Sequence, residues 1–311
     1  MEFIHIPIML EECMENLSIK KNGIYVDGTL GGAGHSQNIL KRIPNGHLIG
    51  IDKDDEALNV SNQRLLNISP NFTLVKGDHK DIKSIVNNLG YQKVDGILLD
   101  LGMSSYQIDN AERGFSYMGN AFLDMRMDKT QKLTAEYIVN NYSEQELLDI
   151  LYNYGEENFA KSIVSNIIKE RKIKKIETTL ELSEIIKKSV PMKFQKNGNP
   201  CKKTFQALRI EVNGELVDLE NTLKDCIELL NENGRLCVIT FHSLEDRIVK
   251  KTFQLESASC ICPPKLPICV CNHKPKVRLV SKKPIEPSLI EQETNTRCKS
   301  SKLRVVEKLC N

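Results

Sequence analysis

A glycine-rich turn near the N-terminus constrains the fold of this chain more than any other feature. Residues 23–36 read GIYVDGTLGGAGHS: a short apolar strand, a turn with four glycines, and the start of a helix. Glycine allows positive φ and a close approach to a ligand, and the helix that follows presents unpaired N–H groups. The next expected strand, HLIGID, ends at Asp52, where a Rossmann-type site needs an acid for ribose hydroxyls. The pattern predicts an adenosine-containing cofactor.

Apolar segments recur along the first third of the chain at the spacing of an α/β fold. Strands are expected at 23–29, 47–52, 72–78 and 94–102, with helical patterns between them. Strands that alternate with helices form a parallel sheet that is covered on both faces. The sequence therefore predicts an α/β fold with a doubly wound, Rossmann-like core.

The alternation then gives way to a long helical region, from about Thr130 to Pro191. Ser143 and Glu146 have the spacing of a capping box, and Thr179 is expected to open another helix. We expect an all-helical domain over 129–202, inserted into a core made of 1–128 and 203–311.

The α/β pattern resumes after the insertion. One helix is expected over 204–234, with Gly234 as its C-terminal stop, followed by a strand over 235–243. The segment LRVVEKL at 303–309 is expected to be the last strand.

Composition excludes several classes of protein. The net charge is only +2 for 311 residues, so any contact with nucleic acid requires local clusters of basic residues. The chain has no Trp and 5% aromatic residues, which argues against a base-stacking platform. We find neither a signal peptide nor an apolar run of membrane-spanning length, and the ten cysteines are then expected to be thiols in the cytoplasm.

The spacing of the turn distinguishes between cofactors. G-x-x-G-G-x-G is not the dinucleotide pattern G-x-G-x-x-G, which argues against a nicotinamide-dependent oxidoreductase. Asp52, Asp78 and Asp100 each end an expected strand, and three acids at one sheet edge can accept hydrogen bonds from the amino group, ribose and adenine of S-adenosylmethionine. A purely structural turn is the alternative.

The segment LLDLGMSSYQID at 98–109 places polar groups next to that turn. Asp100, Ser104 and Ser105 are candidate catalytic groups, because acceptors around an aromatic amine favour its attacking, pyramidal form. The alternative is a polar junction between a strand and a loop.

Several motifs in order resemble one family. They are DGTLGGAGHS, DGILLDLGMSS, AERGFSY with LDMRMD at 111–128, TFQALRIEVNGEL at 204–216 and ITFHSLEDRIVK at 239–250. Over nearly the whole chain this resembles the RsmH (MraW) family of 16S rRNA (cytosine-N4)-methyltransferases. The resemblance implies a class I methyltransferase core with a helical insertion, S-adenosylmethionine as cofactor, and methylation of N4 of cytidine 1402 in the ribosomal decoding centre.

The resemblance also implies site residues. The family's cofactor contacts fall on Ala33, Gly34, His35, Asp52, His79, Asp100 and Gln107, to which the turn and the strand ends add Gly31, Gly32 and Asp78. Where the family usually reads SSPQ, this chain has Ser104-Ser105-Tyr106-Gln107.

Basic residues are the candidates for contact with RNA. Arg113 and Arg126 are expected to bind RNA phosphate or to shape the cytidine pocket; the alternative is that they pair with Asp124 and Asp128 and fix their loop, and the two roles are compatible. Two basic clusters bracket the insertion and are expected to bind RNA; their candidate residues are Lys172, Lys174, Lys202, Lys203 and Arg209.

Two further motifs have competing interpretations. His242 is a candidate for positioning the substrate, and the alternative is a hydrogen-bonded structural histidine. Ser243 is expected to cap the following helix, with Asp246 at its third position. Free thiols and no metal are expected for Cys260, Cys262, Cys269 and Cys271, because C-x-C pairs are tighter than the usual zinc spacing; a tetrahedral zinc site is the alternative.

The sequence thus predicts a cytoplasmic enzyme that acts on 16S rRNA or the small ribosomal subunit, without membrane attachment. DNA amino-methyltransferases usually have a Pro-Pro-aromatic motif after the fourth strand, and this chain has Gly-Met-Ser-Ser there. A non-catalytic rRNA-binding protein is a further alternative. The oligomeric state, including a dimer, is left open.

Overall fold

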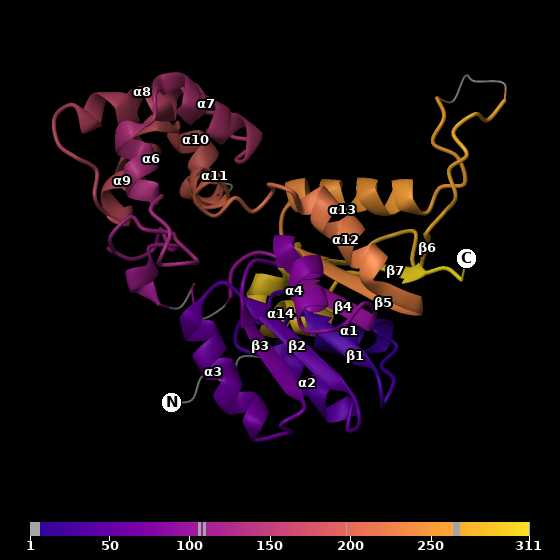
Figure 1. The fold of residues 1–311 in the computed structure, drawn as a ribbon. Coiled ribbons are helices and arrows are strands. Elements are labelled where there is room, and N and C mark those ends of the chain that lie inside the picture. Colours follow the sequence, from indigo (N-terminus) through magenta and orange to yellow (C-terminus); the bar gives the residue numbers. More distant parts are fainter. Residues whose placement is uncertain (1–6, 105–106, 108–109, 197, 264–267, 311) are drawn as a thin grey trace. The chain divides into compact units, whose positions relative to one another are not determined.

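The computed structural model describes residues 7–104, 107, 110–196, 198–263 and 268–310. The chain forms two compact units, Met1–Gly102 with Asp218–Asn311, and Met103–Val217 (Figure 1). Residues 103–128 and 203–217, expected in the core, belong to the second unit. The reason is hydrophobic: Leu123, Met125 and Phe205 are buried in the cluster that holds the inserted helices together.

The first unit contains one seven-stranded sheet in the order β3-β2-β1-β4-β5-β7-β6. Strands β1 to β5 are parallel where they pair, and β7 runs antiparallel to both β5 and β6. The predicted doubly wound α/β fold and the predicted last strand are confirmed. The strands are β1 (Ile24–Asp27), β2 (His47–Asp52), β3 (Phe72–Lys76), β4 (Val94–Asp100), β5 (Leu230–Thr240), β6 (Val277–Leu279) and β7 (Lys302–Lys308).

The helices of this unit follow from the strand order. From β1 the chain moves outward to β3, then returns to β4 and moves outward in the other direction. Because crossovers are right-handed, this reversal covers both faces of the sheet. The helices are α1 (Leu10–Asn16), α2 (Gly34–Arg42), α3 (Asp55–Leu66), η1 (His79–Asp81), α4 (Ile82–Asn88), α12 (Leu219–Leu229), α13 (Ser243–Glu256), α14 (Leu289–Thr294) and η3 (Thr296–Ser300).

The strand order also brings three acids to one edge of the sheet. Strands β2, β1 and β4 are neighbours, and each ends in an aspartate: Asp52, Asp27 and Asp100. Asp27 pairs in register with Gly50 on one side and with Leu98 on the other. In open α/β sheets, ligands bind at this carboxyl edge, where the strand order reverses.

The second unit is helical. Its cluster of apolar side chains includes Ile138, Leu147, Ile163 and Leu182, all fully buried. The predicted Ser143–Glu146 capping box is present, and the helix predicted to open at Thr179 begins there, with Thr178 and Glu181 forming its capping box. The helices are η2 (Ala111–Arg113), α6 (Ala135–Asn141), α7 (Glu144–Asn153), α8 (Ala160–Arg171), α9 (Thr179–Ser189), α10 (Met192–Gln195) and α11 (Cys201–Asn213). Among the described residues, no helix is both long enough and apolar enough to cross a bilayer.

The single helix predicted over 204–234 is wrong. α11 ends at Asn213 because Gly214 adopts a left-handed conformation with φ of 61°, and α12 ends at Leu229. Gly234 is not a helix stop, since it lies within β5. The amphipathic pattern continues through the break, so periodicity alone did not reveal it.

Substituting Gly214 tests this break. Gly214→Ala places a Cβ on a residue with φ of +61°, which costs about 1–2 kcal/mol in the left-handed region. We expect the free energy of unfolding of the helical unit, measured by urea denaturation, to fall by that amount. Gly119→Ala is the control, because a Cβ there meets no atom within 4 Å among the described residues. Equal losses in both variants would contradict the interpretation.

Candidate functional site

The turn between β1 and α2 has a backbone that only a few residue types tolerate. Gly31 and Ala33 both have positive φ, of 49° and 60°. A Cβ on Gly28 would lie 2.5 Å from Leu99 Cδ2, and one on Gly34 would lie 2.4 Å from Pro7 Cγ. The absence of a side chain lets the turn pack closely against Leu99 of β4 at Gly28, and against Pro7 of the N-terminal segment at Gly34.

Three side chains from β2 and α3 hold the turn in place. Asp52 Oδ2 accepts the N–H of Gly31 at 2.7 Å. Ser61 donates to the carbonyl of Gly31, and Arg64 donates to the carbonyl of Gly32, both at 2.7 Å. The acid predicted for a ribose contact therefore also fixes the shape of the turn. Burial raises the pKa of Asp52, although hydrogen bonds from the N–H groups of Asp54 and Gly31 oppose this.

Asp27 lies beneath the turn and was not among the predicted site residues. Its side chain accepts hydrogen bonds from Ser36 Oγ at 2.7 Å and from the N–H of Thr29 at 3.2 Å. Burial raises the pKa of Asp27 to about 6, although both hydrogen bonds favour the ionised form. The available signal was an acid directly before the first glycine of the turn.

Asp100 occupies the corresponding place at the end of β4. Its N–H donates to Thr29 Oγ1 at 2.6 Å, which joins the turn to this strand. Oδ1 of Asp100 is buried and has no hydrogen-bond partner among the residues that the structure describes. Burial, followed by the charges of Asp27 and Glu245, raises the pKa of Asp100 well above its usual value. A buried acceptor without a partner is costly unless a ligand supplies a donor.

His35 packs beside Asp100. Its Nδ1 lies 3.8 Å from Asp100 Oδ2, and its Nε2 lies 2.9 Å from the carbonyl oxygen of Ile8. The ring is buried at the first turn of α2. His35 therefore ties the N-terminal segment to the carboxyl edge of the sheet and forms one wall around Asp100.

Asp78 and His79 follow β3. Asp78 accepts from Lys53 Nζ at 3.2 Å and caps η1 through the N–H of Lys80. Burial acts to raise the pKa of Asp78, but Lys53 and His79 outweigh it and the pKa is lowered. Burial lowers the pKa of His79, so its ring is neutral near pH 7. The Cβ of His79 lies 3.5 Å from the position of a Cβ on Gly28, so the imidazole belongs to the surroundings of the turn.

The predicted residues beyond β4 lie in the second unit. Ser104 and Gln107 contact each other, since the N–H of Ser104 donates to Gln107 Oε1 at 3.2 Å and the N–H of Gln107 donates to Ser104 Oγ at 3.3 Å. Ser105, predicted as catalytic, lies outside the described residues. The sheet unit thus brings together the turn, Asp52, Asp78, His79 and Asp100, while Ser104 and Gln107 form a separate contact.

His242 has a structural role that Ser243 was expected to fill. It is the N-cap of α13: its Nδ1 accepts the N–H of Glu245 at 3.4 Å, and Glu245 Oε2 accepts the N–H groups of Phe241 and His242. Ser243 is the first helical residue, so the predicted cap is wrong by one position. Because Glu245 is buried, this capping box fixes the carboxyl end of β5.

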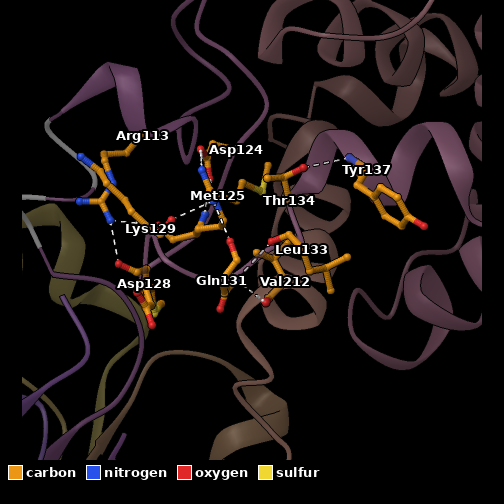
Figure 2. Close-up of polar contacts among 12 residues, drawn as sticks. Arg113, Asp124, Met125, Asp128, Lys129, Gln131, Leu133, Thr134, Tyr137 and Val212 are labelled. Carbon is orange, nitrogen blue, oxygen red and sulfur yellow. Dashed lines mark hydrogen bonds and ion pairs between the residues drawn. The ribbon is translucent and has the colours of Figure 1, made fainter. Parts of the chain in front are cut away.

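The two arginines of the 111–128 segment fix their own loop. Arg113 is buried and donates from Nη2 to the carbonyls of Arg126 and Met127, both at 2.9 Å. Arg126 forms a bidentate pair with Asp124, and it also donates to the carbonyls of Lys129 and Gln131. Figure 2 shows this loop, in which Gln131 also donates to the carbonyl of Val212 at 2.9 Å. These contacts support the loop-fixing interpretation.

The remaining RNA candidates differ in whether the structure gives them a partner. Arg209 pairs with Glu215 through two hydrogen bonds and is mostly buried. Lys174 is exposed and pairs with Glu181, and Lys203 donates to the carbonyl of Glu156. Lys172 and Lys202 are exposed at the end of α8 and the start of α11.

Comparison with known proteins assigns the chain to one family. The model of the MraW methylase family matches residues 2–309. Ribosomal RNA small subunit methyltransferase H from Finegoldia magna is 53% identical over 311 residues, covering 99% of this chain and all of that protein. The proteins of the same name from Clostridium botulinum strain 657 and Lachnospira eligens are each 52% identical, covering 99% of this chain and 100% and 99% of their own lengths.

Asp27 gives the folded chain a distinct pH dependence. A carboxyl group whose pKa rises on folding stabilises the fold fully below its unfolded pKa, and this contribution is lost as the pH rises through the folded pKa of about 6. We expect the free energy of unfolding of the wild type, measured relative to that of Asp27→Asn, to fall by up to about 3 kcal/mol between pH 4 and pH 6.5. Urea unfolding at several pH values measures this difference. The exposed Asp149→Asn variant should follow the wild type, and a pH-independent difference for Asp27→Asn would refute the assignment.

Proposed function

Because the chain belongs to the MraW methylase family, we propose that it methylates N4 of cytidine 1402 in the decoding centre of 16S rRNA. The chain is a methyltransferase, and S-adenosylmethionine is its cofactor. Its relatives carry the name ribosomal RNA small subunit methyltransferase H, which supports small-subunit rRNA as the substrate. What we propose beyond this is that N4 is the atom, and cytidine 1402 the nucleotide, that receives the methyl group.

The unpartnered Oδ1 of Asp100 is the observation that supports the proposed chemistry most directly. S-adenosylmethionine supplies an electrophilic methyl group on a sulfonium, together with an ammonium group and a ribose diol. The buried Oδ1 of Asp100 fits a cationic or N–H donor, and Asp52 has further lone pairs to accept from hydroxyls. The carbonyls and carboxyls at this edge accept hydrogen bonds, which suits both the cofactor and an incoming exocyclic amine.

Direct transfer to nitrogen fits the cysteines of this chain. Attack on the pyrimidine ring would require an activated thiolate near the turn. Cys13, Cys226 and Cys237 are buried in the sheet unit, and burial raises the pKa of each thiol. An amine needs no covalent enzyme intermediate, because its own lone pair attacks the methyl group. Positioned acceptors then provide the main catalytic contribution.

The proposal is tested with purified enzyme, S-adenosylmethionine, and small subunits from a strain that lacks this protein. Mass spectrometry of rRNA nucleosides should detect N4-methylcytidine at one site, and naked 16S rRNA is assayed separately to identify the true substrate. Asp100→Asn should lower kcat/KM by at least about 100-fold. Asp95→Asn is the matched control, since Asp95 lies in the same strand and pairs with Lys20 and the N–H of Ile24. Methylation at carbon or at N3, or equal losses in both variants, would contradict the proposal.

The raised pKa of Asp100 predicts how cofactor binding depends on pH. The ammonium group of S-adenosylhomocysteine favours the ionised carboxyl, so binding releases a proton below the pKa of the free site. We expect affinity to rise with pH, by up to about tenfold per unit, and to level off above that pKa. Calorimetric titration of wild type and Asp100→Asn measures this, and the variant should lose most of the slope. A slope of equal size in the variant would exclude Asp100 as the group that titrates.

A further inference from the structure

The segment between α13 and β6 has no hydrophobic core of its own. None of the described residues among 257–276 is buried. Its base is attached to the end of α13, where His273 Nε2 lies 3.1 Å from the carbonyl oxygen of Leu255 and the N–H of Lys276 donates to the carbonyl of Glu256 at 2.8 Å. In Figure 1 the described parts of this segment extend away from the sheet beyond the end of α13. Burial of apolar side chains therefore does not hold the described residues beyond that base in place.

Four cysteine sulfurs meet within this segment. The Sγ atoms of Cys260, Cys262, Cys269 and Cys271 all lie within 4.8 Å of one another. Three of the separations are 3.9 Å for Cys262–Cys269, 3.5 Å for Cys269–Cys271 and 3.9 Å for Cys260–Cys271. Four sulfurs around a zinc ion at about 2.3 Å form a tetrahedron with edges of about 3.8 Å. The cluster has the dimensions of such a site.

The backbone of the segment is arranged to stabilise negative sulfur. The N–H of Cys262 points at Cys260 Sγ at 3.4 Å, and the N–H of Val270 points at Cys262 Sγ at 3.4 Å. The N–H of Ile261 points at Cys271 Sγ at 3.5 Å. N–H donors of this kind delocalise the charge of thiolate ligands around a metal. They also explain the short C-x-C spacing, because the residue between two ligands directs its own amide toward a sulfur of the cluster.

We propose that Cys260, Cys262, Cys269 and Cys271 bind one structural zinc ion. Four thiolates fill a tetrahedral shell and leave no open position, so the site stabilises structure and does not catalyse. Binding replaces the thiol protons with the metal, and no oxidation or reduction is involved. The short distances between the four sulfur atoms favour a single ion, because the iron and sulfide ions of an iron–sulfur cluster would hold the thiolates further apart. The proposal adopts the zinc alternative in place of the free thiols expected from the sequence.

Metal analysis of the full chain tests the proposal. Protein purified under reducing conditions without chelator should contain about one zinc ion per chain by plasma mass spectrometry. Cys260→Ser combined with Cys271→Ser should reduce zinc to near zero. Cys310→Ser is the matched control, because Cys310 is also exposed but lies outside the cluster, and it should retain full zinc content. Cobalt substituted for zinc should show the visible absorption of a tetrahedral thiolate site in wild type and control only.

A second measurement separates loss of the metal from loss of the fold. The segment begins at the opposite end of α13 from His242, roughly 20 Å along a 14-residue helix. The double variant should therefore bind S-adenosylhomocysteine normally, while proteases cut it within 257–276 far faster than wild type. Zinc-free wild type that takes up no zinc when reduced, iron in place of zinc, or equal zinc in the double variant would each overturn the proposal.

Discussion

Two aspartate carboxyl groups at the ends of neighbouring parallel strands determine the architecture of the candidate site. Asp27 ends β1 and Asp100 ends β4, and Thr29 links them by accepting the N–H of Asp100 while donating its own N–H to Asp27. Burial is the main cause that raises the pKa of both carboxyls, and the charge of Asp27 raises the pKa of Asp100 further. The two acids differ in one respect: Asp27 receives a hydroxyl from Ser36, whereas Oδ1 of Asp100 has no partner among the described residues.

That asymmetry separates a structural acid from a ligand-binding one. Asp27 is satisfied within the protein, so it can hold the turn in the same shape whether or not a ligand is present. No described residue supplies a donor to Oδ1 of Asp100, so a ligand that did so would make ionisation of this carboxyl and binding mutually dependent. A fixed turn beside a carboxyl oxygen without a donor is the kind of preorganised arrangement that the proposed methyl transfer to an aromatic amine needs.

The sequence predicted the parts of the site that depend on topology. Strand ends and glycines placed Asp52, Asp100 and the turn at one edge, because parallel strands bring their carboxyl ends together. The sequence-based prediction was wrong where two neighbouring side chains could make the same contact. His242 caps α13 because Glu245 completes a capping box with it, and Ser–Asp spacing one residue later gave a similar signal. Burial also shows a contact that the sequence does not reveal, as for Arg113, which donates to two carbonyls within its own loop.

Burial also divides the ten cysteines into two groups, because five are buried and five are at least partly exposed. Cys13, Cys201, Cys226, Cys237 and Cys298 lie in apolar cores and act as small hydrophobic residues there. The segment that holds the other cluster is too short to build a core, and short segments without a core need another source of stability. Four thiols that converge where none of the described residues is buried are better explained by coordination than by chance. The methyltransferase core and its projecting segment are then stabilised by different physical means, hydrophobic burial in one and metal–sulfur bonds in the other.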